Sequence, residues 1–209
     1  ATIPLGAPVD DLPPSENLVD NHIFAKLRTL GLPPSPLTDD STFLRRVTID
    51  IAGRLPTLEE TNAFLSGTDP GKRERKIDQL LAGTDYADYF AGKWAAILRN
   101  KRTASHHARG SFAFHAWIRE ALHQNTPYDE FVQEFVSASG EVGHNPPVIW
   151  YRTVKDSKEQ LQDVAQIFLG QRLQCAQCHH HPYEKWSQDD YYGFQAFFSK
   201  VGRKPGNQP

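Results

Sequence analysis

The chain has 209 residues, which is enough for one large domain with extended ends but cramped for two independent cores. Apolar residues make up 39% of the chain and 14 residues are glycine, which is a globular composition. The formal net charge at pH 7 is −2, which excludes the strongly basic overall charge of proteins that bind nucleic acid or anionic membranes. No stretch approaches 18 consecutive apolar residues, so we expect no membrane contact from this segment.

Helix signals recur along the whole chain, each with its own start and stop residues. Apolar residues at helical spacing predict nine helices, over about residues 19–30, 39–52, 57–66, 77–82, 86–98, 111–122, 127–136, 157–169 and 187–201. Thr57 with Glu60 and Ser187 with Asp190 have capping-box spacing, and Thr126 before Pro127 predicts an N-cap followed by the first helical residue. Only residues 147–151 suit an extended segment. The sequence therefore predicts an all-α fold.

The predicted helices form a single domain with short flanking segments. We expect a Pro-rich N-terminal extension over residues 1–14, one helical domain of about nine helices over residues 15–201, and a linker or tail over residues 202–209. No internal repeat is visible.

The two cysteines of the chain lie in one motif, Cys175-Ala176-Gln177-Cys178-His179. C-x-x-C-H is the attachment motif of c-type haem. Its spacing allows two thioethers to reach the two vinyl groups on one edge of the porphyrin while the adjacent imidazole turns underneath to bind iron. The motif predicts that the domain is wrapped around one covalently bound haem c, with Cys175 and Cys178 as attachment points and His179 as the proximal metal ligand.

Three other interpretations of the motif are weighed against haem. A redox dithiol needs a thioredoxin-like βαβ context, which is not visible. Zinc could use both cysteines with two of His179, His180, His181 and a distant histidine, but three consecutive histidines do not match the usual ligand spacing. A structural disulfide between residues three apart closes a very small loop and contributes little stability.

Residues around the motif suit a flat apolar cofactor. The aromatic side chains Tyr183, Trp186 and Phe197, together with Phe194 and Phe198, follow the attachment point and are candidate cofactor-binding residues, although core packing would explain each one equally well. Haem propionates need cationic donors, and the candidates by charge alone are Arg45, Arg46, Arg54, Arg99 and Arg152.

The second axial ligand is constrained by the absence of methionine. Because the chain contains no Met, it cannot supply the His/Met ligation of many electron-transfer cytochromes. The sixth position must then hold another His, a weaker ligand, water or nothing. His115 is the first choice as a second metal ligand because it shares a helix edge with Ile118 and Leu122. The next candidates are His144, His106 and His107.

Several segments together resemble a known family. They are residues 43–47 (FLRRV), 53–57 (GRLPT), Trp94, 127–131 (PYDEF), 145–147 (NPP), 168–170 (FLG), 174–182 (QCAQCHHHP) and 186–192 (WSQDDYY). Over about residues 17–201 the chain resembles the planctomycete-specific cytochrome c-like domain family of unknown function, second type. The resemblance implies a module of larger, exported bacterial proteins, commonly next to another cytochrome-like domain. It implies no reaction.

These observations favour a mono-haem c-type cytochrome domain that transfers single electrons to or from a redox partner protein or a neighbouring haem domain. Two alternatives stay open: a haem enzyme or gas- or peroxide-responsive sensor with an open distal site, and a structural module stabilised by haem. Covalent attachment to reduced cysteines takes place outside the bacterial inner membrane. We therefore expect an extracytoplasmic location, periplasmic or exported, and a signal sequence preceding this segment.

Overall fold

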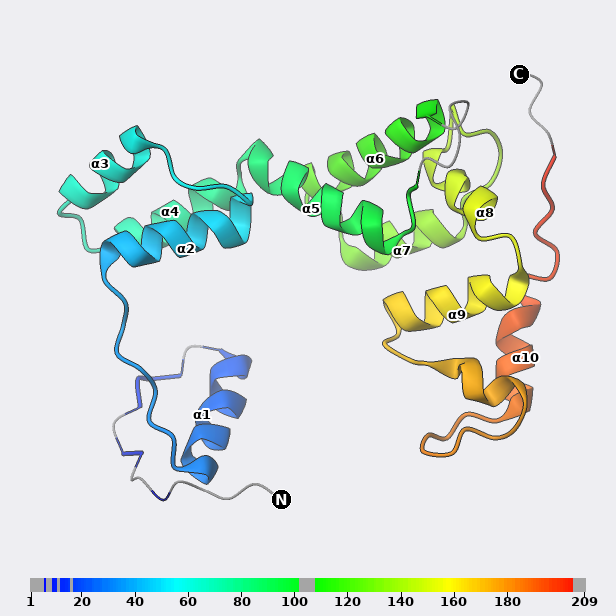
Figure 1. The fold of residues 1–209 in the computed structure, drawn as a ribbon, viewed down its shortest axis with the longest axis horizontal. Coiled ribbons are helices and arrows are strands. Elements are labelled where there is room, and N and C mark those ends of the chain that lie inside the picture. Colours follow the sequence, from blue (N-terminus) through cyan, green and yellow to red (C-terminus); the bar gives the residue numbers. More distant parts are fainter. Residues whose placement is uncertain (1–5, 7–8, 11, 16, 102–107, 205–209) are drawn as a thin grey trace. The chain divides into compact units, whose positions relative to one another are not determined.

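The structure is a computed structural model that describes residues 6, 9–10, 12–15, 17–101 and 108–204. This part of the chain contains ten α-helices and two short 3₁₀ helices and no strand (Figure 1), which confirms the all-α prediction. None of its helices is long and apolar enough to cross a membrane. The contacts divide the chain into two compact units, residues 1–44 and 45–209.

The first unit contains α1 (Leu18–Leu30) and the first residues of α2 (Asp40–Ala52). Asn17 caps α1 by accepting a hydrogen bond from the amide of Asp20, and Gly31 ends the helix with a φ of 64°, a conformation that glycine adopts without steric cost. No residue of α1 is buried: Val19 is 66% exposed and Ile23 is 52% exposed. The predicted helix is confirmed.

The second unit begins within α2 and continues through α3 (Leu58–Ser66), α4 (Lys72–Leu81) and α5 (Thr84–Ile97). The predicted capping box of Thr57 and Glu60 is present at the start of α3. The Glu60 carboxylate also accepts hydrogen bonds from Arg54 and from the buried Lys76, and Arg54 additionally pairs with Asp85. One carboxylate thus joins the end of α2 to α3 and α4.

α5 packs against α6 (Ala108–His123). The residues that α5 buries are Ala87, Ala91 and Ala95, whereas Ile97 is 48% exposed. Alanines at i, i+4 and i+8 form a flat stripe that lets a second helix approach closely, so small side chains make the contact and the larger aromatics lie at its edges.

Beyond α6 the core is aromatic. It includes Phe114, Phe135 on α7 (Tyr128–Val136) and Trp150 on α8 (Ile149–Thr153), with ring centroids 6.1 Å apart for the first pair and 5.1 Å for the second. Two local predictions are wrong here. Pro127, not Thr126, occupies the N-cap of α7, because its ψ of 140° is not helical. Residues 147–151 are not extended, since the 3₁₀ helix η2 (Pro146–Val148) runs directly into α8.

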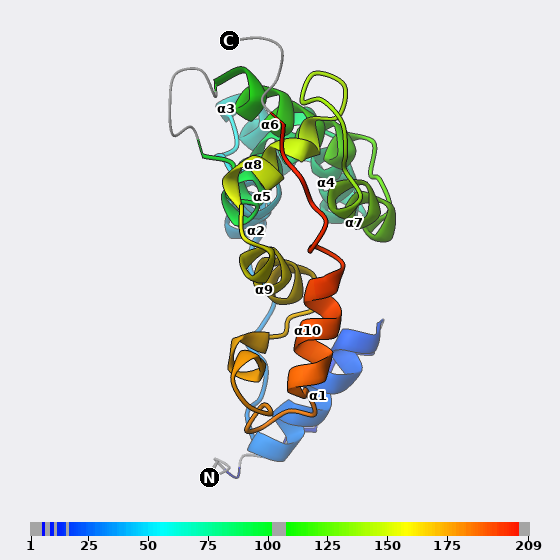
Figure 2. The ribbon, with the colours of Figure 1, turned by 90° about the vertical axis from the view of Figure 1, so that its right-hand side faces the viewer.

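The chain ends with α9 (Ser157–Phe168), the 3₁₀ helix η3 (Leu173–Gln177) and α10 (Gln188–Ala196). The predicted capping box of Ser187 and Asp190 is present, but α10 stops at Ala196 and residues 197–200 form turns, so the helix is shorter than predicted. Both views show η3 and the following loop on the far side of α9 from α6 (Figures 1 and 2).

Candidate functional site

The C-x-x-C-H motif lies in the connection between α9 and α10. The chain reverses here, so the C-terminal end of α10 packs against the N-terminal end of α9, and the motif occupies the intervening loop at the other end of α10 (Figure 1). Three side-chain hydrogen bonds fix this arrangement: Gln195 to Ser157 at 2.8 Å, Gln162 to the Tyr191 hydroxyl at 3.2 Å, and Trp186 Nε1 to Gln171 at 3.1 Å.

The motif forms a single turn in which both cysteines are exposed to solvent. Leu173 and Ala176 of η3 are buried, while Cys175 and Cys178 are exposed and free. Cys175 lies in η3 and Cys178 is its C-cap, three residues later. With about three residues per turn, this spacing favours placing the two cysteines on the same side of the turn. The carbonyl of Cys175 accepts hydrogen bonds from the amides of Cys178 at 3.3 Å and His179 at 3.4 Å, which closes the turn.

The imidazole of His179 is oriented by a contact between its Nδ1 and the neighbouring backbone carbonyl. Its Nδ1 lies 2.6 Å from the carbonyl oxygen of His180, and the side chain is exposed. Because a carbonyl can only accept a hydrogen bond, Nδ1 is the donor in this contact and Nε2 takes no part in it. Metal-ligating histidines commonly donate their other ring nitrogen to a backbone carbonyl or carboxylate in this way.

His181 has a different role, because it holds the loop that follows the motif. Its amide donates to the carbonyl of Trp186 at 2.8 Å, and its Nδ1 accepts hydrogen bonds from the amides of Tyr183 at 3.3 Å and Glu184 at 3.0 Å. Nδ1 of His181 is therefore unprotonated and engaged. This side chain organises residues 181–186 from inside the loop.

The end of the loop is fixed by the α10 capping box. The Asp190 carboxylate accepts hydrogen bonds from both the amide and the hydroxyl of Ser187 at 2.8 Å. These bonds, from the backbone first and the side chain second, lower the pKa of Asp190 below its usual 3.8. The residue therefore stays ionised and the start of α10 stays ordered at neutral pH.

Three of the five predicted aromatic cofactor residues, Tyr183, Trp186 and Phe197, are not equivalent. Trp186 is half-buried and fixed by Gln171, and Tyr183 is 91% exposed in the same loop as the motif. Phe197 is 82% exposed but follows the last residue of α10, nine residues after Gln188, which places it about 13 Å along the helix from the end that meets the motif. The structure brings Tyr183 and Trp186 to the motif's loop and leaves Phe197 at the opposite end of α10.

His115 is not brought to the motif either. It lies on α6, which packs against α5, η2 and α8, whereas η3 packs against α9 and α10. His144 is exposed in the turn before η2, and His106 and His107 lie outside the described residues. The arrangement gives no support to His115 as a second axial ligand, and that assignment stays a prediction.

The donor set fits covalent haem better than zinc. Within residues 17–101 and 108–204, no three His, Cys, Asp or Glu side chains converge in a way that would hold a metal ion. A structural zinc site needs four converging ligands, whereas a haem iron takes four nitrogens from the porphyrin and only one or two ligands from the protein. The motif offers one imidazole next to two exposed thiols, and this set suits a covalently attached haem, whose iron needs only one or two protein ligands.

The candidate propionate donors include two arginines that already have partners. Arg54 pairs with Glu60 and Asp85, and Arg99 pairs with Asp163 at 2.6 Å. Burial of Asp163 raises the pKa of its carboxyl, and the charge of Arg99 opposes that rise. Both guanidinium groups therefore act in packing the second unit.

Sequence reasoning missed the residues of α10 that hold the motif. The carbonyl of Gln177 accepts hydrogen bonds from the Tyr192 hydroxyl at 3.1 Å and from the Gln188 amide group at 3.3 Å. Gln188 and Tyr192 are four residues apart and share one face of α10. That spacing is visible in the sequence, but nothing local indicates what the face contacts.

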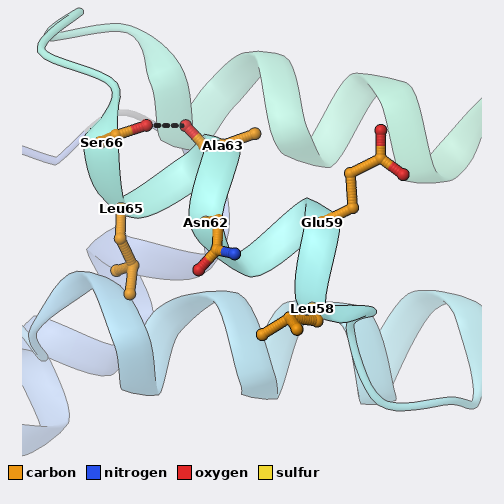
Figure 3. A pocket seen from close by; sticks show the side chains of 6 residues that line it. All are labelled: Leu58, Glu59, Asn62, Ala63, Leu65 and Ser66. Atoms are coloured by element: carbon orange, nitrogen blue, oxygen red, sulfur yellow. Dashed lines mark hydrogen bonds between the residues drawn. The ribbon is translucent and has the colours of Figure 1, made fainter.

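An open depression lies elsewhere, on α3 (Figure 3). The only charged residue that lines it is Glu59, and Ser66 donates its hydroxyl hydrogen bond to the Ala63 carbonyl. It contains no pairing of a nucleophile with a base. Its lining residues are Leu58, Glu59, Asn62, Ala63, Leu65 and Ser66.

Comparison with known proteins gives a family. No curated protein and no solved structure is significantly similar to the chain. The model of the PSCyt2 family matches residues 18–203, so the chain belongs to this family, which is described as protein of unknown function (DUF1549).

Proposed function

We propose that this chain carries one haem c, attached through Cys175 and Cys178 with Nε2 of His179 as the proximal ligand, and that it transfers single electrons. The observation that carries the proposal is the 2.6 Å contact of His179 Nδ1 with the His180 carbonyl, which frees Nε2 beside two exposed thiols. When bound, the group would supply a one-electron couple.

Residues near the motif have distinct parts in this function. His179 orients its own ring through the neighbouring carbonyl, Trp186 offers a fixed apolar surface, and Tyr183 offers an aromatic ring at the rim. Because the turn is exposed, a cofactor edge would lie at the molecular surface, where a redox partner protein or a neighbouring haem domain can approach. The resemblance to planctomycete cytochrome c-like domains, and the extracytoplasmic location it implies, support the same proposal.

The first test is covalent attachment. Protein produced in a bacterium with a c-type cytochrome maturation system should show the mass of the polypeptide plus one haem under denaturing conditions. Cys175→Ala with Cys178→Ala should lose that mass entirely, because the chain has no other cysteine. Recovery of one tightly bound zinc in place of haem would contradict the proposal.

The second test is the proximal ligand. His179→Ala should change the optical spectrum of the haem protein and lower its melting temperature, because the cofactor loses its axial bond to the protein. His180→Ala is a matched control, because His180 is adjacent to His179 and its side chain is exposed. The substitution retains the His180 backbone carbonyl, which orients the His179 ring. Equal spectra for His179→Ala and the unmodified protein would refute the assignment.

One observation favours a second candidate, a haem enzyme or sensor with an open sixth position. The two helices that contact η3 are α9 and α10, and neither contains a histidine. The spin state separates the candidates. A low-spin, six-coordinate spectrum that resists carbon monoxide supports electron transfer, and a high-spin spectrum with rapid carbon monoxide binding supports the enzyme or sensor.

A further inference from the structure

We propose that Tyr192, assisted by Gln188, is a positioning residue that holds the C-x-x-C-H turn in its thiol-presenting geometry before any cofactor binds. This inference rests on the proposed function for its consequence, but its structural content concerns the polypeptide alone. The feature that carries it is the carbonyl of Gln177, which accepts two hydrogen bonds from α10. We call these two bonds the Gln177 clamp.

The Gln177 carbonyl is placed where it controls the motif. Gln177 lies between the two cysteines, and its carbonyl belongs to the peptide group whose amide is that of Cys178. A peptide group is planar, so fixing the carbonyl oxygen also fixes the direction of that amide, which donates to the Cys175 carbonyl at 3.3 Å. The clamp therefore sets the orientation of Cys178 relative to Cys175.

The clamp is anchored on a rigid element. Ser187 and Asp190 cap α10, and Tyr191 is 1% exposed in the core of the second unit. Tyr191 and Tyr192 also meet edge to face, with ring centroids 5.3 Å apart. Because Tyr191 and Tyr192 are adjacent, burial of the first limits the position of the second. The hydroxyl of Tyr192 thus reaches Gln177 from a fixed base.

The α9 side of the turn is less constrained. Between the end of α9 and η3, the Gln171 amide donates to the Ala165 carbonyl, and the residues that follow, Arg172 and Gln174, are exposed. Leu173 and Ala176 fix the inner face of η3 by burial, but burial does not select the orientation of the peptide group between Gln177 and Cys178. The clamp provides that selection.

A consequence follows for attachment. Each thioether would form by addition of a cysteine S–H across a vinyl C=C, with sulfur bonding one carbon and the proton going to the other, so nothing leaves and no oxidant is needed. Two such additions must take place on one edge of one porphyrin, so a turn that already presents both thiols on one side avoids the ordering cost that a mobile turn would incur. One hydrogen bond corresponds to about a three- to tenfold change in such an equilibrium. We expect Tyr192→Phe to slow covalent attachment by this factor, and the double variant Tyr192→Phe with Gln188→Ala to slow it further.

The test begins with the haem-free, reduced protein. Hydrogen exchange at the amides of Cys178 and His179 should be about three- to tenfold faster in Tyr192→Phe, with the melting temperature nearly unchanged. Tyr128→Phe is a matched control, because Tyr128 is 54% exposed on α7 and its hydroxyl bonds none of the residues that the structure describes. Faster exchange in Tyr192→Phe alone supports the clamp. Equal exchange in both variants overturns it.

The second arm measures the rate at which added haem becomes covalently attached to the reduced protein, read as the mass increase under denaturing conditions. Slower attachment in Tyr192→Phe but not in Tyr128→Phe supports the positioning role, and equal rates overturn it. If protein produced with the maturation system carries no haem while haem-free Tyr192→Phe still exchanges faster, the proposed function fails and the clamp stands. The two failures are therefore distinguishable.

Discussion

Replacing Glu60 with glutamine is expected to destabilise the second unit. The two carboxylate oxygens of Glu60 accept four hydrogen bonds: two from Arg54, at 2.8 and 3.2 Å, one from Lys76 at 2.9 Å, and one from the Thr57 amide at 2.8 Å. The Thr57 bond is itself half of the capping box. A glutamine side chain has only one accepting oxygen, so it cannot serve all of these donors.

The size of the effect follows from exposure. Hydrogen bonds to charged groups contribute about 1.5–3 kcal/mol each when buried, and much less at the surface. The side chains of Glu60 and Arg54 are 22% and 37% exposed, but that of Lys76 is only 7% exposed and would keep just a long contact to Gln79. We therefore expect Glu60→Gln to lower the free energy of unfolding by about 2–3 kcal/mol at pH 7.

The pH dependence gives the decisive measurement. Hydrogen bonds from Arg54, followed by those from Thr57 and Lys76, outweigh desolvation and hold the pKa of Glu60 well below its usual 4.5. A carboxyl with a lowered folded-state pKa contributes stability above pH 4.5, and this contribution is lost as the pH falls below that value. Glu60→Gln cannot titrate, so the two proteins should approach equal stability in acid.

Urea unfolding at a series of pH values, followed by circular dichroism, measures this difference. Glu59→Gln is the matched control: Glu59 is adjacent, is exposed and also lies in the first turn of α3, so it should change the free energy of unfolding by less than about 0.5 kcal/mol. A loss for Glu60→Gln that is the same at pH 3 and pH 7, or a loss of equal size for Glu59→Gln, would refute the reasoning.

Three further substitutions test the packing by thermal or urea unfolding. Gly53→Ala should lower the free energy of unfolding by more than about 1 kcal/mol, because Gly53 has a φ of 68° and an added Cβ would meet the ring of Tyr89. Gly92→Ala, on an exposed helical position with open space, should instead raise it by about 0.5–1 kcal/mol; a loss would contradict the α5 assignment. Phe135→Ala should lower the free energy of unfolding by about 3–5 kcal/mol, because Phe135 is fully buried. The control Phe112→Ala should lower it by less than about 1 kcal/mol, because Phe112 is 70% exposed, and equal losses for both variants would show that the aromatic core is misplaced.

Helix ends were predictable because capping is local chemistry. The box of Thr57 and Glu60 and the box of Ser187 and Asp190 each lie within four residues, and both are present in the structure. Gly31 likewise ends α1 in the left-handed conformation. The side chains that satisfy the free backbone groups at a helix end lie within a few residues of those groups. The helix end can therefore be predicted without knowing the rest of the fold.

Predictions that depend on tertiary packing were less accurate. Val148, Ile149, Trp150 and Tyr151 favour a strand by residue type, yet the last three are buried in α8. A short helix that is surrounded by other helices can bury successive residues, and this removes the periodicity that would identify it. The inner face of α5 is hard to identify from the sequence for the opposite reason, because alanine carries a weak hydrophobic signal although it allows close helix packing.

In the candidate site, too, residues that are close in the sequence were predictable, and residues that depend on tertiary packing were not. The two thiols and the imidazole proposed as proximal ligand lie within five residues, so the motif names all three, and the structure places them on one turn. Tyr192 is 15 residues from Gln177, and its role depends on how α10 returns to the loop. His115 was chosen for its position on one helix edge, but that edge belongs to a helix that packs against other partners.

The sequence and the structure together limit which residue could bind the sixth coordination position of the proposed haem iron. Methionine is absent from the chain, so it cannot serve. His181 uses Nδ1 to hold its own loop, and it follows His179 so closely that reaching the opposite face of a porphyrin would require breaking the bonds to Tyr183 and Glu184. A site closed by a protein side chain thus needs a histidine or a weaker ligand from another segment to move onto the exposed turn, which costs ordering free energy, whereas an open site needs no rearrangement of the described residues. Because Tyr192 and Trp186 already fix the turn, a closed site should reveal itself by added order in the segment that supplies the ligand and not in the turn itself.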